Sequence, residues 1–219
     1  QSAVSDLEVA QKEVVGNLWF IKYKVANSNS NIVVATTRPE TMFGDVAVAV
    51  NPKDKRYLKF IGKFCYIPIS NKKIPIIGDD YADPTKGSGA VKITPAHDFN
   101  DFNVGKKNNL PVINIFNQNA TLNNNVPKEF QNVDRFEARK KLLSKLDENN
   151  LLIKEEKQKM VIPYGDRSGV IIEPLLTDQW FCNAKKLSKD PINNVKNHKT
   201  KFFPKHWEKT FFQWMNNIE

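Results

Sequence analysis

Short apolar segments separated by turn-forming residues are the feature that most limits how this chain can fold. In residues 18–25 the side chains alternate, so one side of a predicted strand carries Trp19, Ile21, Tyr23 and Val25. Further segments rich in β-branched or small apolar residues follow at 32–37, 46–50 and 90–93. Residues 74–77 contain a proline, which predicts an edge or irregular strand. The pattern predicts a sheet of many short strands.

Helical patterns are fewer. The clearest covers residues 135–148, where Asp134 caps the start and the apolar face consists of Phe136, Leu142, Leu143 and Leu146. Asn51 and Pro52 predict a second, short helix that runs to about Phe60. Another short helix is expected after Asp98. Many short strands with a few flanking helices indicate an α+β domain whose core is a barrel-like mixed β-sheet.

The charge of the chain is basic. Its 33 Lys and Arg against 24 Asp and Glu give a net charge of +9, which favours a polyanionic partner such as nucleic acid. Lysine and asparagine are abundant along the whole chain, as in proteins from AT-rich genomes. A solvated basic surface without such a partner is therefore the alternative interpretation.

Several classes of protein are disfavoured by the composition. The chain has no stretch of about 18 apolar residues, so we expect no membrane-spanning helix. Its polar, acidic first ten residues do not form a signal peptide. Cys65 and Cys182 both lie among apolar residues and are predicted to be small core or half-buried residues, which fits a reducing, cytoplasmic compartment. The spacing of the three histidines predicts no metal site.

The last part of the chain changes character beyond about Gly165. It becomes rich in lysine and in aromatic residues, from Trp180 and Phe181 to Trp214. Such a segment either packs against another domain of a longer protein or forms a small second core of its own. Residue patterns leave both alternatives open.

A first polar cluster, Thr36-Thr37-Arg38-Pro39-Glu40-Thr41, follows an apolar strand. Pro39 cannot donate to a strand ladder, so the strand is expected to end here and to expose the neighbouring side chains. An arginine in such a position suits a phosphate or ribose phosphate. The alternative is a polar transition from strand to turn without function.

A second cluster occupies residues 87–102. Gly89 permits a tight turn or the close approach of a ligand. Lys92 and Thr94 are two apart on a strand and share one face, and Asp98 and Asp101 are three apart and share one face of a helical turn. A cation, a hydroxyl and two carboxylates in one pocket suit a substrate that carries an ammonium group and a hydroxyl.

Covalent catalysis is not indicated by these clusters. His97 beside an aspartate is more often a structural histidine than a base, and no Ser-His-Asp or Cys-His set can be assembled. A hydrolase with this sequence is expected to position a water molecule instead of forming a covalent intermediate.

Together the two clusters resemble the connective insertion that performs editing in class I valyl-, leucyl- and isoleucyl-tRNA synthetases. The resemblance covers essentially the whole chain, because the flanks also match, at residues 3–9, 167–169, 173–181 and 214–219. The phrase from Lys92 to Asp98 and the return arm are most similar to the valyl form. Lys86 departs from the pattern, which has a larger apolar residue there to contact the terminal adenosine.

This resemblance implies a domain organisation and an activity. Residues 1–16 are expected to form an arm from the catalytic domain, 17–165 the editing core, and 166–219 the arm that returns. The expected reaction is hydrolysis of threonyl-tRNA(Val), because a pocket sized for valine cannot strongly reject an isostere that adds a hydroxyl. The alternatives are a leucyl-type editing domain and a tRNA-binding module without activity of its own, with the Lys-rich tail as its surface.

The resemblance also implies roles for individual residues. Asp101 is expected to hold the α-ammonium group of the substrate. Asp98 and Lys92 bind the threonine hydroxyl or orient water, and these two roles stay open. Thr36 and Thr37 contact the ester or the water, and Arg38 contacts the terminal nucleotide. The remaining residues of the expected substrate-binding set are Thr94, His97, Glu40 and Gly89.

No metal or cofactor is expected for this segment. The HIGH and KMSKS-like signatures of class I catalysis are missing, so ATP is expected to be used only by a catalytic domain outside the segment. The expected partners are the 3′ end of tRNA(Val) carrying threonine and the remaining domains of the parent synthetase. The segment is expected to be a cytoplasmic monomer without membrane contact.

Overall fold

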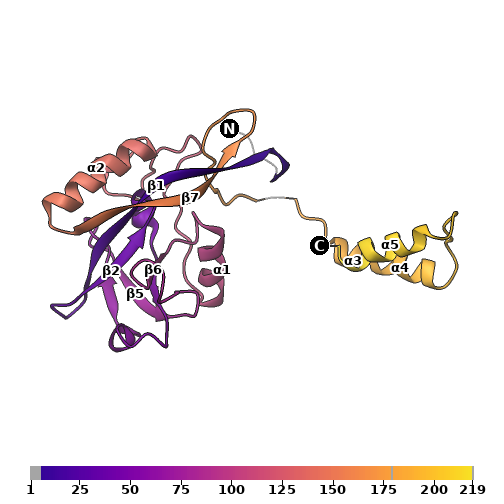
Figure 1. Cartoon of the computed structure of the whole chain (residues 1–219), viewed down its shortest axis with the longest axis horizontal. Coiled ribbons are helices and arrows are strands. Elements are labelled where there is room, and N and C mark those ends of the chain that lie inside the picture. Colours follow the sequence, from indigo (N-terminus) through magenta and orange to yellow (C-terminus); the bar gives the residue numbers. More distant parts are fainter. Residues whose placement is uncertain (1–5, 179, 219) are drawn as a thin grey trace. The chain divides into compact units, whose positions relative to one another are not determined.

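The computed structural model describes residues 6–178 and 180–218 (Figure 1). The chain divides into two compact units, of which the first ends at Leu176 and the second begins at Thr177. Positions 1–5, 179 and 219 of the predicted arms lie outside the described residues. The predicted division at residues 16 and 165 refers to a longer protein and stays a prediction.

The first unit is built on a mixed, seven-stranded sheet. Its path runs β2-β1-β4-β5-β3-β6, with β7 paired to β1. Only β3 and β5 are parallel among the described pairs. The two ends of the path, β2 and β6, contact each other, so the sheet is curled. The strands are β1 (Val9–Val25), β2 (Asn31–Thr36), β3 (Ala47–Val50), β4 (Phe64–Tyr66), β5 (Lys73–Gly78), β6 (Ala90–Ile93) and β7 (Leu152–Gly165).

The predicted fold class is confirmed, because this sheet is flanked by a few helices. These are α1 (Phe99–Lys107) and α2 (Arg135–Glu148), with short 3₁₀ turns η1 (Asp6–Glu8), η2 (Pro39–Gly44), η3 (Leu58–Phe60) and η4 (Lys128–Phe130). The predicted alternation in β1 is also confirmed: the side chains of Trp19, Ile21, Tyr23 and Val25 are all buried. They join Leu142 and Leu146 of α2 in one hydrophobic core.

Both predicted helices are present, and each begins after a capping aspartate. The Asp98 carboxylate accepts from the backbone N–H of Asn100 and Asp101, and the Asp134 carboxylate accepts from Phe136 and Glu137. In Figure 1, α2 lies beside the long β1–β7 pair and α1 beside β6, in agreement with the contacts between these elements. The cap at Asp98 fixes where α1 starts, and so where Asp101 points.

The predicted helix from Asn51 to Phe60 is wrong. Turns cover most of this segment, and only Leu58–Phe60 is helical, as η3. The Asn51 side chain accepts from the N–H of Lys53, and the Asp54 side chain accepts from the N–H of Arg56. Such local side-chain bonds stabilise turns that compete with a helix.

Residues 74–77 were predicted to form an edge or irregular strand, and only the edge alternative is wrong. β5 lies inside the sheet path, between β4 and β3. It pairs with β4 through Pro75 and with β3 from Ile76 onward. The proline is tolerated because the strand changes partner at this point.

Neither β7 nor the first half of β1 was predicted, because the predicted strand covered only residues 18–25. Residues 9–16 extend β1 and pair with residues 158–165 of β7. Most of β7 is exposed and rich in lysine and glutamate, so it shows no apolar alternation. The pairing satisfies the backbone of both strands, which a hydrophobic pattern does not reveal.

The second unit is helical, with α3 (Ala184–Leu187), α4 (Lys189–Lys196) and α5 (Trp207–Asn216). It has a small core, with Val195 buried and the Phe202 and Phe211 rings 5.0 Å apart. Several large aromatic side chains are nevertheless exposed: Trp180, Phe181, Phe203, Trp207 and Trp214. No helix in the described part of the chain is long and apolar enough to cross a membrane.

The two cysteines differ in their surroundings. Cys65 lies in β4 and is fully buried, as predicted. Cys182 is exposed, which corrects the prediction of a half-buried or core residue. It lies in the irregular segment before α3, where the neighbouring Phe181 is exposed too.

Candidate functional site

The first polar cluster, residues 36–41, is called the threonine-rich peptide from here on. It leaves the sheet as predicted, because β2 ends at Thr36 and η2 begins at Pro39. Local hydrogen bonds hold the turn between them. The Thr36 hydroxyl accepts from the N–H of Arg38 at 3.1 Å, and the Thr41 hydroxyl donates to the Arg38 carbonyl at 2.9 Å. The expected exposure of these side chains is wrong: Thr36, Glu40 and Thr41 are buried, and Thr37 is half-buried. The peptide therefore has a fixed shape before any ligand binds.

A chain of buried polar groups lies beneath this peptide. The Lys92 ammonium donates to the Thr41 hydroxyl at 2.8 Å and to the Thr94 hydroxyl at 2.5 Å. It also lies 3.3 Å from Asp45 Oδ1, to which the Thr94 hydroxyl donates at 2.7 Å. The predicted shared face of Lys92 and Thr94 is thus confirmed. Sequence reasoning missed Asp45, because a single aspartate before an apolar strand gives no signal that it is buried.

Asp101 lies next to this chain of hydrogen-bonded polar groups. Its Oδ2 accepts from the backbone N–H of Thr94 at 2.8 Å, and its side chain is buried. Burial raises the pKa of Asp101 to about 6, against the lowering effects of Lys92 and of the Thr94 N–H. Asp98 itself is exposed at the start of α1 and adds to the pKa rise of Asp101.

Tyr81 is a second residue near Asp101 that sequence reasoning missed. Burial and the neighbouring carboxylates of Asp101 and Asp98 raise the pKa of Tyr81. Its side chain is partly exposed and lies in a turn before the Gly-rich loop. No spacing rule connects it to α1, so only the fold brings the phenol to these carboxylates.

His97 has a structural environment. Its Nε2 accepts from the N–H of Ile115 at 3.0 Å, and its ring packs edge-on against Phe116. Burial and the charges of Arg38 and Lys92 lower the pKa of His97 to about 3. The imidazole is therefore neutral near pH 7, and its engaged Nε2 does not serve as a general base. Its carbonyl accepts from Arg38 Nη1 at 3.0 Å.

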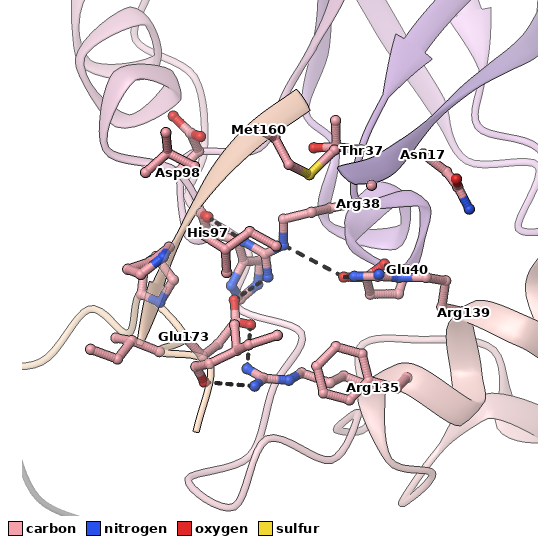
Figure 2. A pocket seen from close by; sticks show the side chains of 18 of the residues that line it. Asn17, Thr37, Arg38, Glu40, His97, Asp98, Arg135, Arg139, Met160 and Glu173 are labelled. Carbon is pink, nitrogen blue, oxygen red and sulfur yellow. Dashed lines mark hydrogen bonds and ion pairs between the residues drawn. The ribbon is translucent and has the colours of Figure 1, made fainter. Parts of the chain in front are cut away.

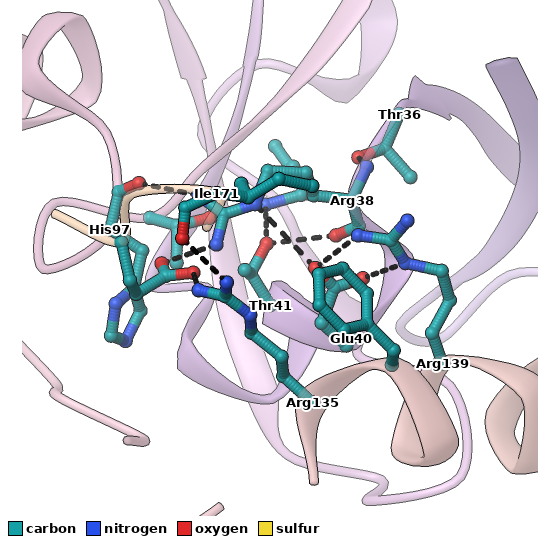
Figure 3. Close-up of polar contacts among 12 residues, drawn as sticks. Thr36, Arg38, Glu40, Thr41, His97, Arg135, Arg139 and Ile171 are labelled. Atoms are coloured by element: carbon teal, nitrogen blue, oxygen red, sulfur yellow. Dashed lines mark hydrogen bonds and ion pairs between the residues drawn. The ribbon is translucent and has the colours of Figure 1, made fainter. Parts of the chain in front are cut away.

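Three arginines and two glutamates form a second cluster, which we call the arginine cluster (Figure 3). Arg139 binds both oxygens of Glu40 at 2.7 Å, and Arg38 lies 3.5 Å from the same carboxylate. Arg38 and Arg135 both pair with Glu173, Arg135 at 2.7 Å. Glu173 belongs to the predicted return arm, so this arm is tied to the threonine-rich peptide.

The arginine cluster borders a cavity of about 380 Å³ (Figure 2). Five of the sequence-predicted site residues line it: Thr37, Arg38, Glu40, His97 and Asp98. Its other lining residues include Trp19, Phe136 and Met160, which are apolar. An apolar cavity with arginines on its wall suits a nucleotide end.

Gly89 has a structural explanation among its neighbours. Its φ is +80°, and a side chain there would meet the Arg56 guanidinium. Arg56 in turn is held by Asp54 through two guanidinium nitrogens. The glycine is thus required by the turn and by Arg56. In the described ranges, 6–178 and 180–218, no group of three or more His, Cys, Asp or Glu residues is arranged to hold a metal ion.

Comparison with known proteins places the chain in a family. The family described as tRNA synthetases class I (I, L, M and V) matches residues 1–219. The chain therefore belongs to the class I tRNA synthetases.

Relatives within this family are valine–tRNA ligases. Those of Pelagibacter ubique and Caulobacter vibrioides are 56% identical over 219 residues and 52% identical over 239 residues. Each match covers 100% of this chain and 25% or 26% of the ligase, so the chain spans about a quarter of the length of these relatives. A solved ternary complex of Agrobacterium radiobacter K84 LeuRS with tRNA and LeuAMS matches with a TM-score of 0.47 and 20% identity, covering 68% of this chain and 20% of that one.

Proposed function

We propose that this chain is the editing segment of a valine–tRNA ligase and hydrolyses the ester of threonyl-tRNA(Val). The observation that carries the proposal is the buried chain of Lys92, Thr94 and Thr41 next to the Asp101 carboxylate. Lys92 and Thr94 can hydrogen-bond to the side-chain hydroxyl of a substrate, and the adjacent Asp101 carboxylate can bind its ammonium group. Identity of 56% to a valine–tRNA ligase favours the valyl form over the leucyl alternative.

Asp101 is proposed to bind the α-ammonium group of threonine. Its Oδ2 is held by the Thr94 N–H, which orients the carboxylate. A pKa of about 6 leaves it mostly ionised near pH 7, and a bound ammonium group favours the ionised form further. The amino acid is thereby anchored at its α-carbon.

Selection of threonine over valine follows from the threonine hydroxyl. Lys92 is proposed to give one of its three hydrogen bonds to the threonine hydroxyl, whereas valine offers no acceptor for this exchange. The site that binds a hydroxyl discriminates strongly against an analogue that lacks one. Asp98 is exposed at the start of α1 and is proposed to help orient water.

Water is the nucleophile in the proposed reaction. Its oxygen bonds to the ester carbonyl carbon, the bond to the ribose oxygen breaks, and the ribose oxygen receives a proton. Thr36 and Thr37 are proposed to lie near the ester. His97 is proposed to hold its surroundings in place, because its carbonyl accepts from Arg38 and its neutral ring accepts from the Ile115 N–H. This hydrolysis uses no cofactor, and ATP is proposed to serve only the remaining domains.

The proposed partner is the 3′ end of tRNA(Val). Arg38 on the wall of the cavity is proposed to contact the terminal nucleotide, and the net charge of +9 favours an approaching polyanion. The remaining three quarters of the ligase are proposed to carry most of the tRNA contacts. We propose that the segment acts in the cytoplasm, within a monomeric ligase.

The test is release of threonine from threonyl-tRNA(Val) by the 219-residue chain, with valyl-tRNA(Val) as the control. We expect fast release of threonine and little release of valine. Asp101→Ala is expected to lose the activity, and intact deacylation by that variant contradicts the proposed anchor. A panel of other mischarged tRNAs tests the leucyl alternative, since each pocket selects its own side chain.

A tRNA-binding module without activity gives a different result. Binding then depends strongly on salt, is unchanged in Asp101→Ala, and no ester is hydrolysed. A threonyl-adenosine ester separates two causes of inactivity. Hydrolysis of this small ester, but not of the tRNA, shows that the chemistry is present and that tRNA capture needs the other domains.

A further inference from the structure

We propose that Phe99 is a stacking residue for the base of the nucleotide that precedes the terminal adenosine at the 3′ end of the tRNA. This preceding nucleotide then lies at the mouth of the cavity beside the arginine cluster. The inference rests on the proposed function and adds a second nucleotide subsite to it. It gives a role to an exposed aromatic side chain that the hydrolysis of the ester does not itself use.

Phe99 has an unusual position for a large apolar side chain. It is the first residue of α1 and directly follows the cap at Asp98. Its side chain lines the cavity, yet its relative exposure is 76%. The ring therefore adds little to the core of the first unit, and its faces are accessible to a ligand. Every nucleobase can stack on such an aromatic face, whatever its hydrogen-bonding groups.

The cavity connects the proposed hydrolytic site with the arginine cluster. Thr37 and Asp98 line one side of it and Arg135 lines the other (Figure 2). Of the described residues, those proposed to hold the amino acid, Lys92 and Asp101, are not part of its lining. The cavity therefore has room for the nucleotide part of the substrate, and not for the amino acid.

Depth decides which nucleotide Phe99 meets. Lys92 and Asp101 are buried, so the terminal nucleoside that carries the ester enters deepest. Its 5′ phosphate is placed at Arg38, whose guanidinium donates to the carbonyl of His97, two residues before Phe99. The nucleotide on the other side of this phosphate is the one that leaves towards solvent. An exposed ring beside Arg38 therefore meets the base of the preceding nucleotide.

The surroundings of the second phenylalanine in the cavity support this choice. The ring centroid of Phe136 lies 4.7 Å from the guanidinium carbon of Arg135 and 5.3 Å from that of Arg139. These two cations already occupy the surroundings of that ring. Arg38 and Arg139 are partly exposed, so they can attract the phosphate that joins the two nucleotides. Phe99 offers the accessible aromatic face next to this charge.

The experiment compares two small threonyl esters, one of adenosine and one of the dinucleotide cytidylyl-adenosine, which carries the preceding nucleotide of a tRNA end. We expect the native chain to have a KM for the dinucleotide ester that is at least fivefold lower. Phe99→Ala should raise that KM roughly fivefold to hundredfold, because it removes one stacked base. Its kinetics on the adenosine ester, and kcat on both esters, should stay native.

Two further variants separate stacking from simple burial of apolar surface. Phe99→Trp keeps an aromatic face and should keep the native KM for the dinucleotide ester or lower it. Phe99→Leu keeps an apolar side chain without a π face and should lose most of the gain. All three variants are expected to fold, because Phe99 is exposed and the Asp98 cap binds only the backbone N–H groups of Asn100 and Asp101.

Phe64→Ala is the matched control. Phe64 lies on β4 and is also exposed, and the Lys73 ammonium lies 4.6 Å from its ring centroid. It is thus an accessible aromatic ring beside a cation, at a place that does not line the cavity. We expect the native KM for both esters. A loss equal to that of Phe99→Ala would mean that any exposed aromatic ring has this effect, and it overturns the subsite.

The remaining outcomes are distinct. A Phe99→Ala variant with native KM for the dinucleotide ester overturns the role of Phe99. An equal loss on both esters assigns the ring to the terminal adenosine and overturns the assignment to the preceding nucleotide. If the native chain hydrolyses neither ester, the proposed function fails, and titration with unesterified adenosine and cytidylyl-adenosine tests Phe99 by itself. Tighter binding of the dinucleotide by the native chain, lost in Phe99→Ala, supports the subsite, and equal binding by both chains refutes it.

Discussion

The buried polar chain and the arginine cluster are two charged regions of the same unit that are built in different ways. The buried chain contains one ammonium and one carboxylate, Lys92 and Asp45, both nearly inaccessible and both on or next to neighbouring strands. The arginine cluster contains three guanidinium groups around Glu40 and Glu173 and borders an open cavity. A closed pair suits selection of a small side chain, whereas an open cluster suits a phosphate-bearing ligand.

The two regions also differ in where their parts come from. Lys92 lies on β6 and Thr94 directly follows this strand, so the geometry of the pair is local. Glu173, in contrast, follows β7 and lies 135 residues after Arg38 in the sequence. In the first region only the Lys92–Thr94 pair is local, since Asp45 lies 47 residues before Lys92. The second region depends on how the end of the first unit is placed. The following predictions test this difference, from the largest expected effect to the smallest.

Lys92→Met should break the buried chain. It leaves the Asp45 carboxylate buried without its counter-charge, so we expect a loss of about 3–5 kcal/mol in the free energy of unfolding. Threonyl-ester hydrolysis should be lost too. Adding Asp45→Leu should restore much of the stability but not the activity. Urea unfolding and deacylation assays check both, and a single variant as stable as the native chain contradicts the buried pair.

Arg139→Ala should break the arginine cluster. Both oxygens of Glu40 lose their partner, and the Glu40 side chain is inaccessible to water. Arg38 remains 3.5 Å away and partly compensates. We expect a loss of about 2–3 kcal/mol, measured by urea unfolding. The threonine-to-valine ratio should stay native, and a changed ratio would mean that the two regions are coupled.

Asp101→Asn should affect activity and stability in opposite directions, because Asp101 lies next to the buried polar chain. The folded-state pKa of Asp101, about 6, lies above the ordinary value of 3.8. As pH rises from about 4 to about 6, the unfolded chain loses a proton that the folded chain keeps, so this group lowers stability in that range and above it.

The asparagine lacks this cost. We therefore expect Asp101→Asn to be about 1–3 kcal/mol more stable than the native chain at pH 7 and similar to it near pH 4. In the native chain, kcat/KM should fall below about pH 6, because the ammonium anchor is then protonated. Unfolding curves at both pH values and a pH–rate profile are the measurements, and equal stability at pH 7 counts against the buried, ionised carboxylate.

Glu173→Gln should have the smallest effect. It removes one negative charge from between Arg38 and Arg135 while it keeps a hydrogen-bonding side chain. We expect tRNA affinity to rise about fivefold and the dependence of log affinity on log salt to become steeper. Binding titrations at several salt concentrations measure both. Glu137→Gln is the control, since Glu137 pairs with Lys140 on an exposed face of α2.

Local chemistry in the sequence determined much of the scaffold. The sequence correctly predicted the alternation in residues 18–25, the cap at Asp134 and the helix after Asp98. It also predicted the end of β2 before Pro39 and the shared face of Lys92 and Thr94. Each depends on neighbours within a few positions, and hydrogen bonds and side-chain periodicity act over that range.

Tertiary structure alone decided the rest. The pairing of β7 with β1, the burial of Asp45 against Tyr23, and the bond of Glu173 to Arg38 join positions far apart in the chain. Asn51 shows how tertiary contacts override a local preference. Asparagine is a good helix cap, but Asn51 holds a turn and donates to the Ala82 carbonyl instead. Desolvation and long-range pairing depend on which surfaces meet when the sheet curls, and no local pattern of residues encodes that meeting.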